Sequence, residues 1–95
     1  MSEWHSLLRV LSYMVKRTRG NTLYVTYRDV YKICIRLNVK PPSPYKLHKL
    51  MKTYNVQKDC SFIRGGKVTW ILRKNTVLWK LLEESMYTDI LAKIK

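Results

Sequence analysis

The chain is poor in acidic residues, glycine, proline and cysteine, and these shortages exclude several classes of protein. Its 95 residues include 3 Gly, 3 Pro and 2 Cys, which excludes collagen-like, low-complexity and disulfide-rich folds. The longest stretch without a charged side chain, residues 20–27, is far shorter than the roughly 20 apolar residues that cross a bilayer. No secretory signal peptide is recognisable, so we expect an intracellular protein without a membrane partner.

Basic residues outnumber acidic ones by 19 to 6, which gives a formal net charge of +13. Between Trp4 and Lys80 the only acidic residues are Asp29 and Asp59. Such an excess destabilises a compact fold through self-repulsion, so it indicates a partner of opposite charge. For a folded basic domain we expect nucleic acid first, with an anionic membrane surface as the alternative.

Patterns typical of catalysis or of cofactor binding are missing from the sequence. We find no paired carboxylates, no nucleophile with a neighbouring base and no glycine-rich phosphate loop. Neither His5 nor His48 has further ligands at metal-binding spacing. We therefore expect no enzyme activity, no metal, no cofactor and no small-molecule substrate. For His48, an ordinary surface position is the simpler interpretation and pH-dependent binding is the alternative.

Apolar residues at helical spacing predict a first helix over residues 2–18, which Gly20 ends. Residues 22–25 are β-prone and predict one short strand. Thr26 and Asp29 then have the spacing of a capping box, which predicts a second helix over residues 26–38. Asn38 is expected to be its left-handed C-cap.

The second helix has one apolar face and one basic face. Cys34 lies on the apolar face, so we expect a buried small hydrophobe, and a Cys34–Cys60 disulfide is the alternative. The outer face carries Arg28, Lys32 and Arg36. Arg28 and Lys32 are candidates for contacts with a phosphate backbone, and plain solvation is the alternative.

Residues 43–55, SPYKLHKLMKTYN, predict a third helix after the stiff link through Pro41 and Pro42. Ser43 suits the N-cap, and Pro44 suits the first helical position. One face is apolar, with Leu47, Leu50, Met51 and Tyr54. The opposite face carries Tyr45, Lys49 and Lys52, flanked by Lys46, His48 and Thr53. Such a face is expected to lie against a polyanion, and a solvated lysine face is the alternative.

Two β-prone stretches, residues 60–64 and 67–72, are joined by Gly65 and Gly66 and predict a hairpin. Residues 55–59 are expected to form a loop before it. The hairpin tip consists of Arg64, Gly65, Gly66 and Lys67. Glycine allows close backbone approach, and the two cations are placed to reach phosphates or a minor groove. The alternative is an ordinary turn with solvated cations.

A final helix is predicted over residues 76–94, and its first turns are apolar around more than half of the circumference. That is more apolar surface than we expect one small domain to cover, so it indicates a homodimer. The predicted dimer contacts are Val77, Leu78, Leu81, Leu82, Met86 and Ile90. Glu83, Glu84 and Asp89 lie on the same helix, which indicates that it faces away from a polyanion. A monomer whose last helix wraps its own core is the alternative.

This order of elements resembles the winged helix-turn-helix family. The resemblance lies in helices 26–38 and 43–55, the strand at 22–25 and the Gly65–Gly66 hairpin, which would be the wing. The resemblance is architectural and covers nearly the whole chain. Within the family, the chain is similar to small stand-alone regulators of archaea and their viruses. The resemblance implies an α+β fold in one domain over residues 1–95, with a three-helix core, a hairpin wing, a short third strand and an added C-terminal helix. The turn through Val39, Pro41 and Pro42 is longer than that of bacterial repressors.

The resemblance implies a dimeric transcriptional regulator that inserts helix 43–55 into the major groove of double-stranded DNA. The expected contacts on this helix are Ser43, Tyr45, Lys46, His48, Lys49, Lys52 and Thr53. Its basic face lacks Asn, Gln and Arg, which indicates weak base readout or dependence on DNA shape. A non-specific architectural DNA-binding protein and an interaction subunit of a replication or transcription assembly are the alternatives. Stacking platforms for single-stranded RNA are not evident.

Overall fold

The computed structural model describes residues 3–59 and 68–94, which form five helices and three strands. The helices are α1 (Glu3–Arg17), α2 (Tyr27–Arg36), α3 (Pro44–Thr53), α4 (Val77–Glu83) and α5 (Tyr87–Ile94). The strands are β1 (Thr22–Val25), β2 (Gln57–Asp59) and β3 (Thr69–Arg73). The predicted α+β class is confirmed. None of the helices in this described part is long and apolar enough to cross a membrane.

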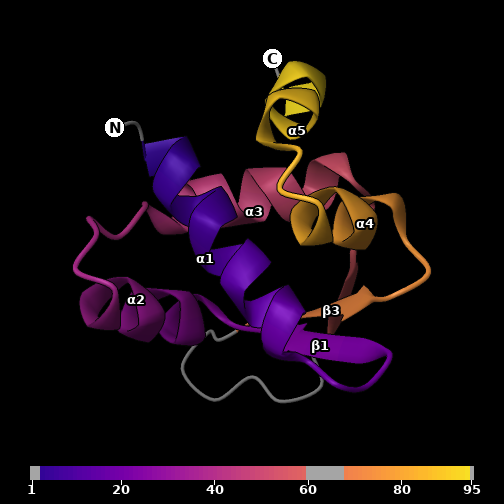
Figure 1. Cartoon of the computed structure of the whole chain (residues 1–95), viewed down its shortest axis with the longest axis horizontal. Helices are drawn as coiled ribbons and strands as arrows, with labels where there is room; N and C mark the ends of the chain where they lie inside the picture. Colours follow the sequence, from indigo (N-terminus) through magenta and orange to yellow (C-terminus); the bar gives the residue numbers. More distant parts are fainter. Residues whose placement is uncertain (1–2, 60–67, 95) are drawn as a thin grey trace.

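α1 is the helix around which the others are arranged (Figure 1). It packs against α2, α3, α4 and α5 and buries apolar side chains along most of its length. Leu7, Leu8 and Leu11 have no exposed surface. The Ser12 hydroxyl donates a hydrogen bond to the backbone oxygen of Leu82 at 2.7 Å, so the buried polar group is satisfied. The position of α1 therefore fixes where the remaining helices lie.

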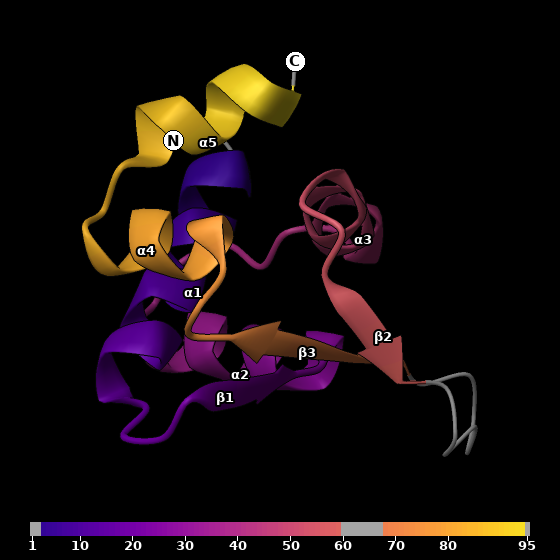
Figure 2. The same ribbon diagram turned by 90° about the vertical axis from the view of Figure 1, so that its right-hand side faces the viewer.

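The strands form one antiparallel sheet in the order β1-β3-β2, which extends to one side of α1 in Figure 2. Trp70 pairs with Val25 of β1 and with Lys58 of β2. Trp70 and Leu72 are 6% and 0% exposed, so this side of β3 faces the core. The strand expected at residues 22–25 is confirmed too.

The start of β2 corrects the prediction of a loop over residues 55–59. Gln57 and Lys58 pair with Ile71 and Trp70, so a strand follows α3 after the three residues 54–56. The side chains of this edge strand are polar, so the sequence shows no alternation of apolar and polar residues there. The strand is defined by its backbone pairing with β3, which a sequence pattern does not show. Cys60 and the predicted hairpin tip, Arg64, Gly65, Gly66 and Lys67, lie outside the described residues.

α2, α3 and α4 all end in the same left-handed turn. Asn38, Asn55 and Ser85 have φ values of 59°, 54° and 58°. After α2, the N–H of Val39 donates to the oxygen of Cys34 at 2.9 Å, which is the hydrogen bond of a Schellman motif. The left-handed cap predicted at Asn38 is confirmed.

The prediction of a single helix over residues 76–94 is wrong, because the chain turns at Ser85. The N–H of Met86 donates to the oxygen of Leu81 at 2.8 Å, which ends α4 before α5 begins. The apolar i, i+4 spacing continues across this turn to Met86 and Ile90. Periodicity therefore gave no sign of the break.

The predicted dimer surface belongs largely to the core of the chain itself. Leu78, Leu82 and Ile90 are at most 1% exposed, and Leu81 packs against the same core. Leu78, Leu82 and Ile90 are unavailable to a second copy, because α4 packs on α1 and α5 packs on α1 and α3, whereas Leu81 keeps part of its surface exposed. Val77 and Met86 are 66% and 43% exposed. Dimer formation itself stays a prediction.

We expect Leu82→Ala to lower the free energy of unfolding by about 2–5 kcal/mol, because it removes a fully buried side chain and leaves a cavity. Val77→Ala is the control on the same helix, and we expect a change of at most about 0.5 kcal/mol there. Chemical denaturation measures both values. A loss no larger than that of the control would contradict the burial of Leu82 within its own chain.

Ser85→Gly is expected to raise the free energy of unfolding by about 0.5–1 kcal/mol, because glycine has no Cβ to clash at positive φ. The matched control is Ser85→Ala, which also loses the 3.0 Å hydrogen bond from Lys16 Nζ to Ser85 Oγ but keeps Cβ. Thermal unfolding compares the two. An alanine variant as stable as the glycine variant would show that backbone strain at Ser85 is negligible.

Candidate nucleic-acid interface

α3 has the two faces that its sequence predicts. Its buried side chains are Leu47, Leu50 and Met51, each at most 2% exposed. On the opposite side Tyr45 is 65% exposed, and His48 and Lys52 are exposed as well. Residues 45, 48 and 52 follow helical spacing, so these three side chains share one solvent-facing surface. We call Tyr45, His48 and Lys52 the α3 face.

The α3 face is rotated toward His48 relative to the predicted centre at Tyr45, Lys49 and Lys52. Lys49 is only half-exposed, and its Nζ lies 6.0 Å from the centre of the Tyr45 ring. The Thr53 hydroxyl donates to the backbone oxygen of Lys49 at 2.7 Å. Lys49 and Thr53 therefore border the α3 face and are partly engaged within the helix.

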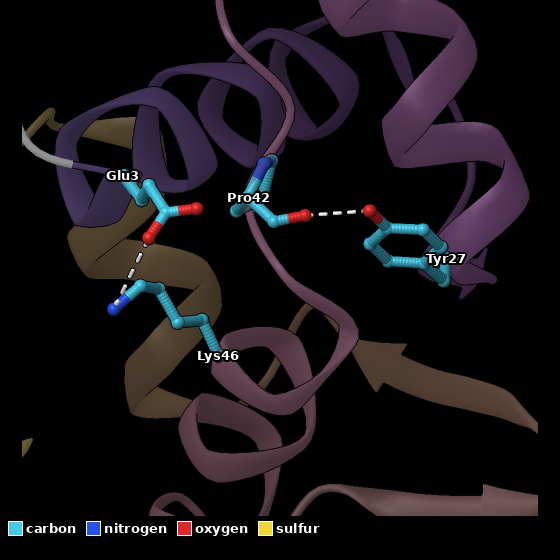
Figure 3. Close-up of polar contacts among 4 residues, drawn as sticks. All are labelled: Glu3, Tyr27, Pro42 and Lys46. Atoms are coloured by element: carbon cyan, nitrogen blue, oxygen red, sulfur yellow. Dashed lines mark hydrogen bonds and ion pairs between the residues drawn. The ribbon is translucent and has the colours of Figure 1, made fainter.

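Lys46 is held away from the α3 face by the start of α1 (Figure 3). Its Nζ lies 3.6 Å from the Glu3 carboxylate and 5.1 Å from the centre of the Trp4 ring. The carboxylate offsets the lysine charge, and the ring packs against the cation. Of the lysines predicted on α3, the structure brings Lys49 and Lys52 to the exposed side and separates Lys46 from them.

The turn between α2 and α3 is fixed by Tyr27, whose hydroxyl donates to the backbone oxygen of Pro42 at 2.5 Å (Figure 3). Burial is the main reason that the pKa of Tyr27 is raised above its ordinary value. Thr26 caps α2 by accepting from the N–H of Asp29 at 3.2 Å, as predicted. Ser43 has the extended backbone of an N-cap, but its side chain makes no capping hydrogen bond.

The outer face of α2 is less polar than the sequence pattern indicates. Arg28 and Lys32 are exposed, as expected for contacts with a phosphate backbone. Tyr31, which lies between these two residues in the sequence, is 47% exposed, and Ile35, which follows them, is 59% exposed. Cys34, on the other side of the helix, has no exposed surface and is a free thiol whose pKa burial raises.

A cavity of about 640 Å³ opens between α2, α3 and the start of β3. We call it the aromatic cavity, because four rings line it. Its walls are Thr26, Tyr27, Arg28, Tyr31, Pro44, Leu47, His48, Val68 and Trp70. Nothing in the sequence patterns predicted this site. Its only local signal is the i, i+4 spacing of Tyr27 and Tyr31, since the other walls come from elements far apart in the chain.

His48 belongs to both the α3 face and the aromatic cavity. Its imidazole packs edge-on against Trp70, with ring centres 5.5 Å apart and planes at 64°. Lys58 Nζ lies 5.8 Å from the centre of the same indole. The cavity thus lies directly beside the exposed surface of α3, and a cation from β2 lies near it.

The α3 face carries no acidic side chain. Glu83, Glu84 and Asp89 are exposed on α4 and α5, whereas α3 contains no acidic residue. In Figure 2, α4 and α5 lie on the left and α3 and β2 lie on the right. The α3 face itself therefore adds no repulsion between carboxylates and phosphate groups.

Comparison with protein-family models, characterised proteins and solved structures finds no match for this chain. Within residues 3–59 and 68–94, no three His, Cys, Asp or Glu side chains gather into a possible metal site. The function must therefore be inferred from the α3 face, the aromatic cavity and the distribution of charge.

Tyr27→Phe is expected to lower the free energy of unfolding by about 0.5–1.5 kcal/mol at neutral pH, because it removes the hydrogen bond to Pro42. The raised pKa of Tyr27 adds a pH dependence. The contribution of the Tyr27 hydroxyl to the free energy of unfolding is fully present below about pH 10 and is lost as the pH rises through the raised pKa. The difference between wild type and variant should therefore narrow above about pH 10. Chemical denaturation at neutral and alkaline pH measures this difference, and a constant gap would contradict the expectation.

Proposed function

We propose that the chain is a winged-helix DNA-binding protein that inserts α3 into the major groove of double-stranded DNA. One observation carries this proposal: α3 buries one face completely and exposes Tyr45, His48 and Lys52 on the other, without an acidic residue. A major groove about 12 Å wide admits one helix with such side chains. The net charge of +13 supplies the attraction to phosphate.

The arrangement of the elements supports a winged-helix layout. α2 and α3 are consecutive helices joined by a short proline-containing turn, and β1 precedes them in the chain. β3 is the central strand of the sheet, and β1 and β2 pair with its two edges. In helix-turn-helix proteins the second helix of the pair enters the groove and the first crosses the backbone. α3 and α2 take these two roles in our proposal.

Arg28 and Lys32 on α2 would contact the phosphate backbone beside the groove. Both are exposed, and Arg28 lies at the wall of the aromatic cavity that α3 shares. Phosphate contacts fix the register of a protein on DNA but carry no base information. The positive charge therefore accounts for affinity and orientation, and specificity depends on the α3 face and on DNA shape.

Two roles are compatible with this binding mode, and we place a transcriptional regulator first. The second candidate is an architectural protein that coats DNA with little sequence preference. It is favoured by one specific observation, the lack of Arg, Asn and Gln in α3. Selection from a random pool of duplexes separates them, because a regulator enriches a defined site and a coating protein does not.

We expect Lys52→Ala to weaken duplex binding about tenfold and to reduce the salt dependence by about one phosphate contact. Lys80→Ala is the matched control, since Lys80 is also an exposed lysine but lies on α4. The two variants change net charge equally and differ only in position. Fluorescence anisotropy on a labelled duplex across a salt series measures both.

Equal losses in the two lysine variants would show that only total charge matters and would contradict the placement of α3 in the groove. A complete lack of duplex binding at low salt would contradict the proposed function as a whole. Circular dichroism of each variant verifies that the fold is intact.

A further inference from the structure

In the proposed complex, α3 lies in the groove of fully paired DNA and no part of the DNA occupies the aromatic cavity. Its rings form two pairs. Tyr27 and Tyr31 of α2 have ring centres 6.3 Å apart with planes tilted by 46°. His48 and Trp70 join α3 to β3 with ring centres 5.5 Å apart. The four rings thus line one space beside the α3 face.

The chemistry of the walls limits what this cavity can hold. A volume of about 640 Å³ lies within the range of sites for small organic groups. The Tyr27 hydroxyl already donates to Pro42, so the remaining polar side chains of the walls are those of Thr26, Arg28, Tyr31, His48 and Trp70. Aromatic walls together with the guanidinium of Arg28 suit a planar ring attached to an anionic group. A nucleobase on its phosphate backbone has this chemistry.

We propose that the aromatic cavity binds an unpaired nucleobase, so that the preferred ligand is a duplex that carries one unpaired nucleotide. The proposal rests on the proposed function and deepens it by naming the class of DNA. Taking a base out of a paired stack is costly, and the cost is smallest when the base has no partner. The unpaired base would stack against the rings while Arg28 contacts its phosphate and α3 stays in the adjacent groove.

Tyr31 is the residue with which to test the cavity. It lines the cavity and is 47% exposed, so truncation removes stacking surface without opening the core. Tyr24 provides the matched control, because it is 60% exposed on β1 and is not among the cavity walls. Tyr31→Ala and Tyr24→Ala therefore remove the same side chain from two different exposed positions.

The experiment measures the affinity of the full chain for three labelled duplexes of one sequence by fluorescence anisotropy at fixed salt. The first is fully paired, the second has one unpaired adenine, and the third has an abasic site at that bulge. Base stacking predicts that wild type binds the adenine bulge about tenfold more tightly than the other two duplexes. The abasic bulge keeps the backbone flexibility but offers no ring to stack.

In the Tyr31→Ala variant this preference should fall to about twofold or less, with affinity for paired DNA unchanged, and Tyr24→Ala should retain the preference. Equal affinity of wild type for all three duplexes would overturn the cavity proposal and leave duplex binding intact. An equal preference for the abasic bulge would assign it to DNA flexibility and would overturn the proposal. A preference for the adenine bulge that survives Tyr31→Ala would mean that the base binds outside the aromatic cavity, which would also overturn the proposal. No binding to any duplex would overturn the proposed function and this proposal together.

Discussion

The burial of α1 among the other helices is the constraint on which the candidate interface depends. Leu7, Leu8 and Leu11 lie fully inside, and burial of such side chains is the main favourable term in folding. Because α1 contacts both α2 and α3, it sets the distance between the two helices that border the aromatic cavity. Its first turn also holds Lys46 through Glu3 and Trp4. α1 therefore determines the positions of α2, α3 and Lys46 in the candidate interface.

Among the described residues, more cations lie near aromatic rings than near carboxylates. One ion pair, between Lys46 and Glu3, is present within residues 3–59 and 68–94, whereas five cations lie over rings. These pairs are Arg17 with Tyr13, Lys46 with Trp4, Lys49 with Tyr45, Lys58 with Trp70 and Lys93 with Tyr54. A ring attracts a cation without cancelling its charge. The fold can thus accommodate its positive excess and still present it to a polyanion.

Sequence patterns predicted the parts of this fold that depend on local periodicity. The buried side of α3, the cap at Thr26 and the left-handed residue Asn38 all follow from spacing within one helix. Periodicity could not show the break at Ser85, where the apolar repeat continues through a turn, nor the polar edge strand β2. It also identified an apolar face on α4 without identifying what covers it.

The same limit explains why the aromatic cavity was missed while the lysines of α3 were found. Tyr31, His48 and Trp70 come from three separate elements, and their proximity depends on the packing of the whole chain. A lysine face is visible in one helix, whereas a cavity is a property of tertiary structure. The Lys46 side chain shows this too, since its partner Glu3 is distant in sequence.

The turn between α2 and α3 has a consequence for the thermodynamics of association. Pro41, Pro42 and Pro44 restrict the backbone, and the Tyr27 hydroxyl is bonded to the oxygen of Pro42. The relative orientation of the two helices is therefore set before any partner arrives. A rigid surface loses little conformational entropy when it binds, so more of the contact energy remains as affinity. Any adaptation of shape needed to bring the surfaces together must then come from the partner.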